Sequence, residues 1–188
     1  MKKVTVPFFI SHQGCPHSCI FCDQRTISGS PGTLPSAESI LEKIRVWRKS
    51  AGNRQLEVAF FGGTFTALSP HAQDQLLEPL QPLLASGEIC SIRISTRPDY
   101  IDPGLVRTLA GRGVRTIEIG VQSMDDGVLE LSGRGHTAAD SEAAISCIRF
   151  AGLAAGAQLM PGLPGDTILK SLQSLKQVID AGASFVRI

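Results

Sequence analysis

Three cysteines lie within eight residues near the start of the chain, in the segment Gly14-Cys15-Pro16-His17-Ser18-Cys19-Ile20-Phe21-Cys22. The spacing C-x3-C-x2-C places three thiols on one loop, and thiolates are the usual ligands of iron–sulfur clusters. A closed 4Fe-4S cluster takes four ligands, so Cys15, Cys19 and Cys22 would leave one iron open to another molecule. The segment therefore predicts a metal centre that keeps one position for chemistry.

A zinc site is the alternative for the same three cysteines. Three cysteines and one histidine form a common tetrahedral zinc set, and His12 or His17 could supply the fourth ligand.

Cys90 and Cys147 stand alone in apolar surroundings, where we expect free cysteine to behave as a small buried hydrophobe. An odd total of five cysteines, without a recognisable secretory signal, argues against a disulfide framework and for a reducing compartment.

Strand-like and helix-like apolar patterns alternate along the chain. Strands are predicted at 4–10, 56–61, 91–95, 116–121, 157–160 and 184–188, and helices at 36–49, 70–85, 103–111, twice within 125–152, and at 167–181. This alternation is typical of a parallel sheet covered by helices, either an open doubly wound sheet or a barrel-like curl. No G-x-G-x-x-G follows the first strand, which argues against a dinucleotide-binding fold.

Glycines and polar residues follow several of these strands. Gly62 and Gly63 end the second strand, where a ligand can approach the backbone closely, although such a pair can also be a plain turn. Thr96 ends the third strand, and Arg134 follows the fourth with a guanidinium suited to a carboxylate. Because parallel β/α folds place their sites at the carboxyl ends of the strands, we expect these residues to converge there.

The fourth strand has one polar face. Glu118, Gly120 and Gln122 alternate with Ile117, Ile119 and Val121, so the two sets point to opposite sides of the sheet. A parallel strand covered on both sides is normally apolar on both faces. The polar row therefore indicates a cavity, with an exposed edge strand as the alternative.

The cysteine segment resembles the signature of the radical S-adenosylmethionine (SAM) superfamily, with Phe21 at the aromatic position before the last cysteine. Further segments resemble the radical SAM domain of Elongator catalytic-subunit-like proteins and their relatives, the oxygen-independent coproporphyrinogen III oxidases. These segments are Thr96-Arg97-Pro98-Asp99, the "GVQS" and "RGH" around Gln122 and Arg134, and "MPGLPG" at 160–165. The resemblance implies an α/β fold, namely a partial (β/α)6 TIM-like barrel of parallel strands, with a 4Fe-4S cluster held by Cys15, Cys19 and Cys22.

The resemblance also implies where SAM would bind. The expected cofactor-binding residues are Phe21, Gly62, Gly63, Thr64, Thr96, Gln122, Arg134 and Gln158. In the family, the glycine pair contacts the methionine amine of SAM, and Phe21 would lie near the adenine. This chain departs from the family at Thr64, where glutamate is common, and at Gln158, where some relatives carry an acidic residue.

The activity implied by the resemblance is reductive cleavage of SAM to a 5′-deoxyadenosyl radical, which then abstracts hydrogen from an organic substrate. An external electron donor of the flavodoxin or ferredoxin type is expected. The substrate is not identified by the sequence; tRNA is one candidate, because Elongator relatives modify tRNA. The alternative is a non-catalytic metal module, either stabilised by zinc or acting as an iron–sulfur electron carrier.

Length and composition set the remaining expectations. The 188 residues carry 18 Lys+Arg and 17 Asp+Glu, and this net charge of +1 argues against a large electrostatic surface for nucleic acid. No apolar run approaches the ~20 residues of a membrane helix, so we expect a cytoplasmic protein. Since the last strand reaches Ile188 without a covering helix, we expect residues 1–188 to be a radical SAM core domain truncated after the sixth strand.

Overall fold

The structure is a computed structural model that describes residues 3–10, 15, 19–22 and 33–188. Within this part of the chain six strands form one sheet in the order β1-β2-β3-β4-β5-β6, and each strand runs parallel to its neighbours. The strands are β1 (Lys3–Phe9), β2 (Gln55–Phe61), β3 (Ile89–Thr96), β4 (Val114–Gln122), β5 (Ala154–Leu159) and β6 (Phe185–Arg187). The α-helices are α2 (Ala37–Ala51), α3 (Pro70–Leu77), α4 (Gln81–Ala85), α5 (Pro103–Gly111), α6 (Asp126–Leu131), α7 (Ala138–Phe150) and α8 (Ile168–Asp180).

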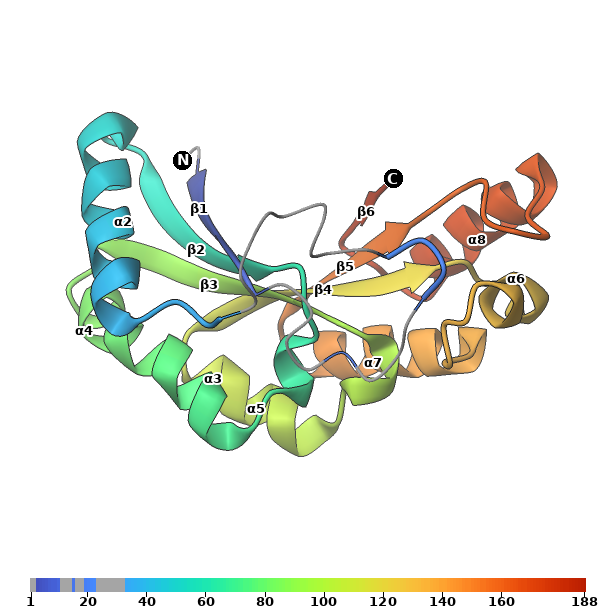
Figure 1. Cartoon of the computed structure of the whole chain (residues 1–188), viewed down its shortest axis with the longest axis horizontal. Coiled ribbons are helices and arrows are strands. Elements are labelled where there is room, and N and C mark those ends of the chain that lie inside the picture. The colour runs from blue at the N-terminus through green and yellow to red at the C-terminus, as the bar shows by residue number, and fades with distance from the viewer. Residues whose placement is uncertain (1–2, 11–14, 16–18, 23–32) are drawn as a thin grey trace.

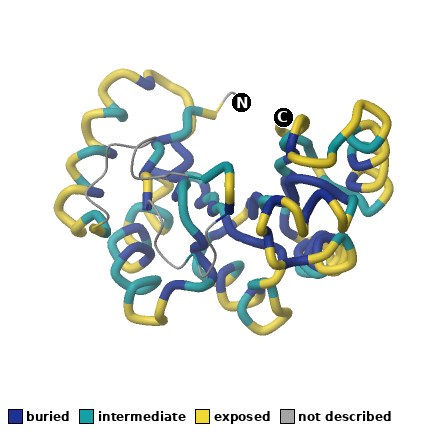
Figure 2. Tube along the Cα trace, turned by 45° about the vertical axis from the view of Figure 1, so that its right-hand side comes forward, coloured by how far each residue is buried: buried dark blue, intermediate teal, exposed yellow. Residues whose placement is uncertain are grey.

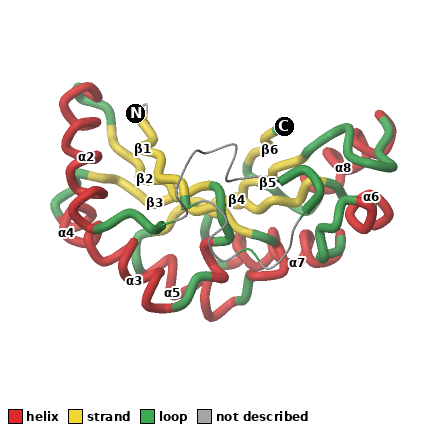
Figure 3. Tube along the Cα trace, viewed as in Figure 1, coloured by secondary structure: helices red, strands yellow, loops and turns green. Residues whose placement is uncertain are grey.

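The sheet is strongly curled, and its helices lie on the outside of the curl (Figures 1 and 3). β1 and β6 form the two edges, and they face each other across an opening instead of pairing. The expected partial (β/α)6 barrel of parallel strands is therefore confirmed. Its sequential strand order is that of a barrel and excludes the doubly wound alternative.

The hydrophobic core lies between the outer face of the sheet and the helices (Figure 2). Alternate strand residues such as Val58, Phe60 and Ile94 are fully buried there, where they pack with Ile40 and Ile44 of α2 and with apolar residues of the other helices. The core side of each strand is therefore the outer side of the barrel. The residues between them point inward, into the curl.

Side chains at the helix starts fix the positions of the helices. The Ser69 hydroxyl accepts a hydrogen bond from the backbone N–H of Ala72, and the Asp102 carboxylate accepts from two N–H groups at the start of α5. Each of these caps is followed by a proline at the first helical position, where the lack of an N–H costs nothing.

One expected helix, 70–85, is broken in the structure into α3, a 3-10 turn at Glu78–Leu80, and α4. Pro79 and Pro82 explain the break, because proline lacks the backbone donor that a continuous helix requires.

Cys90 and Cys147 are also less buried than expected, since both are half-buried. No helix in the described part of the chain has the length and hydropathy needed to span a bilayer.

Candidate cofactor site

A cavity of about 690 Å³ lies inside the curl and is lined by side chains from the strands and from the cysteine segment. Of the eleven residues expected from the sequence to bind metal or cofactor, ten line this cavity: Cys15, Phe21, Cys22, Gly62, Gly63, Thr64, Thr96, Gln122, Arg134 and Gln158. The eleventh, Cys19, is buried and contacts Arg134. Segments from all parts of the sequence are thus brought to one place by the parallel strands.

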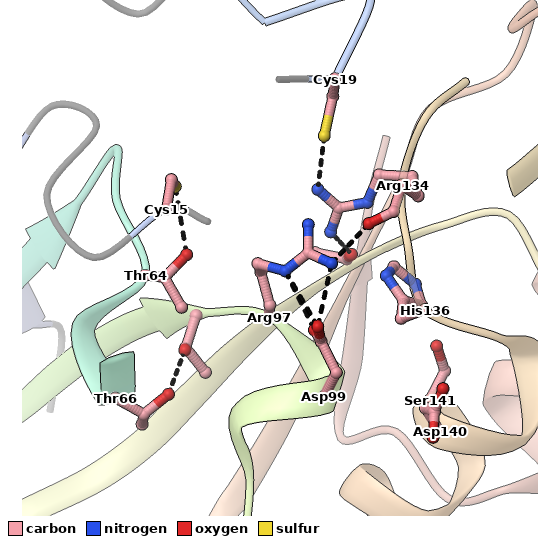
Figure 4. Close-up of polar contacts among 12 residues, drawn as sticks. Cys15, Cys19, Thr64, Thr66, Arg97, Asp99, Arg134, His136, Asp140 and Ser141 are labelled. Atoms are coloured by element: carbon pink, nitrogen blue, oxygen red, sulfur yellow. Dashed lines mark hydrogen bonds and ion pairs between the residues drawn. The ribbon is translucent and has the colours of Figure 1, made fainter. Parts of the chain in front are cut away.

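Cys15 and Cys19 lie near residues that follow β2 and β4, namely Thr64 and Arg134 (Figure 4). The sulfur of Cys15 is 3.1 Å from the hydroxyl oxygen of Thr64, and the sulfur of Cys19 is 3.4 Å from Nη1 of Arg134. A turn joins Cys19 and Cys22, whose N–H donates to the Cys19 carbonyl at 3.0 Å. Cys15 and Cys22 line the cavity, which places two of the three thiols at the same opening.

The thiols do not converge on a single point. Within the described residues no three side chains of His, Cys, Asp or Glu are close enough together to hold a metal ion. Cys15 and Cys19 instead contact two different partners, Thr64 and Arg134. His12 and His17, the fourth ligand in the zinc alternative, lie outside the described residues.

The loop after β2 brings backbone close to the cavity. Gly62 has φ of 85°, a conformation that favours glycine because it has no Cβ. Thr64 follows at the start of a 3-10 turn but its side chain does not cap that turn, so the hydroxyl is available to Cys15. The hydroxyl of Thr96, at the end of β3, is hydrogen-bonded to that of Thr66, and Thr96 is buried.

Gln122 has an unusual backbone at the end of β4. Its φ is 67°, and within the described residues it is the only non-glycine residue with positive φ. The pairing of β4 with β5 shifts register between Gly120 and Gln122. Backbone strain of this kind is typical of functional positions, where the surrounding structure enforces it. The polar row Glu118, Gly120 and Gln122 lines the cavity, which confirms that the polar face of this strand borders a cavity.

Arg134 connects several parts of the site. Its Nη1 contacts the Cys19 sulfur, its Nη2 donates to the Gly120 carbonyl at 2.5 Å, and its guanidinium lies 5.9 Å from the centre of the Phe21 ring. Burial lowers the pKa of Arg134 below its ordinary value, while the contact with Cys19 opposes that change. The residue therefore places a positive charge beside the cysteine segment.

Two further residues of this region were not among the expected site residues. Arg97 is 4% exposed, donates to the Asp99 carboxylate at 3.0 Å and also donates to the backbone carbonyl of Arg134 (Figure 4). His136 is equally buried, and its Nε2 lies 3.2 Å from the Val121 carbonyl. Burial, and then the nearby charges of Arg134 and Arg97, lower the pKa of His136 to about 4. The motifs "TRPD" and "RGH" contain both residues and were the available signal.

The chemistry of the site can be compared with the groups that it is expected to bind. Oε1 of Gln122 and Nε of Arg134 are buried and have no hydrogen-bond partner in the described structure. Buried polar atoms are normally paired, so a polar ligand beside them is expected. The three cysteines supply the soft sulfur ligands that an iron–sulfur cluster requires. The residues present thus fit a thiolate-held cluster next to a polar nucleotide.

Comparison with known proteins agrees with this description. The family model for the Radical SAM superfamily matches residues 9–176. The tRNA uridine(34) acetyltransferase of Methanocaldococcus jannaschii is 25% identical, over 93% of this chain and 39% of that protein. The heme chaperone HemW of Haemophilus influenzae is also 25% identical, over 95% of this chain and 49% of that protein. The chain thus spans about two-fifths to one-half of the length of these relatives.

Solved structures show the same fold. The archaeal Elp3 of Methanocaldococcus infernus superposes with a TM-score of 0.70 at 22% identity, covering 94% of this chain and 42% of that one. Coproporphyrinogen III oxidase (HemN) of Escherichia coli gives a TM-score of 0.67 at 19% identity, covering 99% and 44%. Because the family model covers most of the sequence, the chain belongs to the radical SAM superfamily.

Proposed function

We propose that this chain is the core domain of a radical SAM enzyme, with Cys15, Cys19 and Cys22 as ligands of a 4Fe-4S cluster. SAM would contact Phe21, Gly62, Gly63, Thr64, Thr96, Gln122, Arg134 and Gln158. The observation that carries this proposal is the single cavity that ten of the eleven residues line. The family implies the same two groups, a 4Fe-4S cluster and SAM.

When bound, the cluster would supply the electron that cleaves the sulfonium of SAM and releases a 5′-deoxyadenosyl radical. The protein's own contribution is to bind, orient and shield. The Gly62–Gly63 backbone lets a ligand approach closely, and Arg134 offers a buried guanidinium for a carboxylate. The unpaired Oε1 of Gln122 offers an acceptor for a ligand hydroxyl or N–H. The curl of strands surrounds part of the cavity, and shielding of this kind protects a reactive intermediate from solvent.

The electron donor and the substrate come from outside this chain. We propose a one-electron donor of the flavodoxin or ferredoxin type, because the chemistry of the radical SAM family requires a reductant. We propose an organic substrate, with a tRNA nucleoside as the first candidate. Relatives named as tRNA uridine(34) acetyltransferases support that choice.

Anaerobic reconstitution tests the proposal. The chain is loaded with iron and sulfide, its metal and sulfide contents are measured, and 5′-deoxyadenosine is quantified after dithionite and SAM are added. We expect about four irons per chain from the cluster type, a spectrum that changes on SAM addition, and nucleoside formation. Stoichiometric zinc without sulfide would contradict the proposal and indicate a zinc module. A full cluster whose spectrum does not change when SAM is added would indicate an electron carrier.

Matched cysteine variants locate the cluster. Cys15→Ala, Cys19→Ala and Cys22→Ala should each prevent assembly of a stable 4Fe-4S cluster. Cys90→Ala and Cys147→Ala are the controls and should retain full iron content, because both residues lie outside the cavity lining. Loss of iron in either control would contradict the assignment.

The substrate class is tested by adding either tRNA or a porphyrinogen to the reconstituted chain and measuring which of the two increases the formation of 5′-deoxyadenosine.

A further inference from the structure

A network of charged side chains crosses the inner face of the sheet beneath the candidate cofactor site. Arg93 on β3 is its centre: Nε donates to Glu57 of β2 at 2.9 Å, and Nη1 donates to Oε1 of Glu118 on β4 at 2.7 Å. Lys3 of β1 pairs with Glu57 at 3.4 Å, and Arg187 of β6 pairs with Glu118 at 3.1 Å. The network therefore reaches from one open edge of the barrel to the other.

One end of this network opens into the cavity. Glu118 and Arg187 both line it, whereas Glu57 is buried and does not. Glu118 precedes Gln122 by four residues on the same strand face, which places it roughly 13 Å towards the amino end of β4. Gly120 lies between them, and a Cβ there would come within 2.8 Å of the Gln122 amide nitrogen. The cavity thus extends below Gly120 to Glu118 and across the sheet to β6, where Arg187 lies beside Gln158.

The charges of the network do not balance. Its two carboxylates, Glu57 and Glu118, are 1% and 6% exposed at their side chains, and three cations surround them. Both arginine contacts to Glu118 fall on the same oxygen, Oε1. One positive charge is left over. Arg93 is shared between both carboxylates and lies over the Phe185 ring, and of the two outer cations, Lys3 and Arg187, Arg187 is the one that lines the cavity.

Arg187 is the cation available to a ligand. Its side chain is 52% exposed and it contacts Glu118 through Nη2 alone, so its other donors have no partner within the described residues. A guanidinium presents a planar set of donors that matches the two oxygens of a carboxylate or phosphate. Glu118, held in turn by Arg93, fixes the position of one side of this guanidinium without using all of its donors.

We propose that Arg187, held by Glu118, binds an oxyanion of the substrate, a carboxylate or a phosphate, on the β6 side of the cavity. This inference rests on the proposed function, because it concerns the substrate of the same cavity. It assigns the substrate a negatively charged group on the β6 side of the cavity, where Arg187 neighbours Gln158. A cationic substrate group is disfavoured there, since the surplus charge is already positive.

Nuclear magnetic resonance of the arginine side chains tests the proposal directly. The 188-residue chain, labelled with ¹⁵N and free of cluster, is titrated separately with inorganic phosphate, acetate and neutral acetamide at constant ionic strength. Loss of one Nε–H signal in Arg187→Gln identifies the Arg187 resonance. Arg45 is the matched reference, because it is an exposed arginine paired with one carboxylate, Glu42, at 3.6 Å.

We expect saturable shifts of the Arg187 signal with phosphate or acetate, with an affinity about tenfold or more above that for acetamide. Tighter binding of phosphate than of acetate would indicate a phosphate group on the substrate, and the reverse order would indicate a carboxylate. Shifts no larger than those of Arg45, or equal affinity for acetamide, would overturn the proposal.

Two variants add a second measurement. Arg187→Gln should lower the affinity for the more tightly bound anion at least about tenfold. Arg187→Lys keeps the charge but loses the planar set of donors, so its affinity should fall by an intermediate factor. Circular dichroism verifies that both variants fold. Unchanged anion affinity in Arg187→Gln would overturn the proposal. Because these titrations need neither cluster nor SAM, their failure is distinguishable from failure to form 5′-deoxyadenosine.

Discussion

Nη1 of Arg134 lies 3.4 Å from the sulfur of Cys19, although 115 residues separate them in the sequence. The same guanidinium donates to the Gly120 carbonyl, and the neighbouring Ser132 carbonyl accepts the N–H of Ile20 at 3.3 Å. The segment between α6 and α7 therefore holds Cys19 and Ile20 near the end of β4. A buried cation is thereby placed beside one of the proposed cluster ligands.

Replacing Arg134 should lower the reduction potential of the reconstituted cluster. Hydrogen bonds to the ligand sulfurs and nearby positive charge stabilise the reduced, more negative state. Arg134→Gln removes the positive charge, and we expect a fall of about 60 mV, the equivalent of ~1.4 kcal/mol for one electron. A redox titration followed by electron paramagnetic resonance measures it.

The control for this measurement is Arg45→Gln, which removes an equal charge from the exposed surface of α2. Its potential should stay within a few millivolts of the unmodified chain, because exposed charges are screened by salt. Equal potentials in Arg134→Gln and Arg45→Gln would show that the contact with Cys19 does not influence the cluster.

Gly120→Ala should weaken SAM binding while leaving the fold intact. A Cβ at this position would lie 2.8 Å from Nε2 of Gln122 and 3.2 Å from Nη2 of Arg134, so both side chains must move. We expect the Kd for SAM, measured by calorimetry on the reconstituted chain, to rise about tenfold, which corresponds to ~1.4 kcal/mol. Gly111→Ala is the matched control, because a Cβ there meets nothing within 4 Å. Equal affinities in the two variants would argue against Gln122 and Arg134 as SAM contacts.

The stability of the chain should depend on His136 between pH 6.5 and 4. Its pKa is lowered to about 4 in the folded protein, so in this range the unfolded chain binds the proton more strongly. Stability is therefore fully present above about pH 6.5 and is lost as the pH falls towards 4. The difference between the two pKa values corresponds to about 3 kcal/mol at most.

Denaturant unfolding at several pH values measures this effect. In His136→Gln the titrating group is gone, so the loss of unfolding free energy between pH 6.5 and 4 should shrink by a comparable amount. The remaining loss then reports on the other titratable groups. An identical pH dependence in both proteins would mean that His136 is not buried in its neutral form.

Thr137→Ala should destabilise the start of α7. The Thr137 hydroxyl accepts the Asp140 N–H, and the Asp140 carboxylate accepts the Thr137 N–H, which together form a capping box. Loss of such a cap costs about 1 kcal/mol of the free energy of unfolding. Thr137→Ser, which keeps the hydroxyl, should restore most of the stability in the same denaturant titration.

Several features could be predicted from the sequence because they depend on local chemistry. The alternating apolar pattern predicted the six strands, and the cap at Asp102 with Pro103 predicted the start of α5. The polar alternation of Glu118, Gly120 and Gln122 predicted a cavity, because a strand places alternate side chains on opposite faces. The expectation failed at 70–85, where Pro79 and Pro82 divide one apolar pattern into separate helical pieces.

What the sequence determined by itself is the set of reactive groups and their order: three close thiols, a glycine pair, and polar residues after successive strands. Only the tertiary structure decided which of these groups meet, because the curl of the sheet brings together residues far apart in the chain. The contact of Arg134 with Cys19 and the network of Glu57, Arg93, Glu118 and Arg187 join residues on different elements. No local pattern encodes such contacts, since strand order, stagger and curvature set the distances between side chains on different strands.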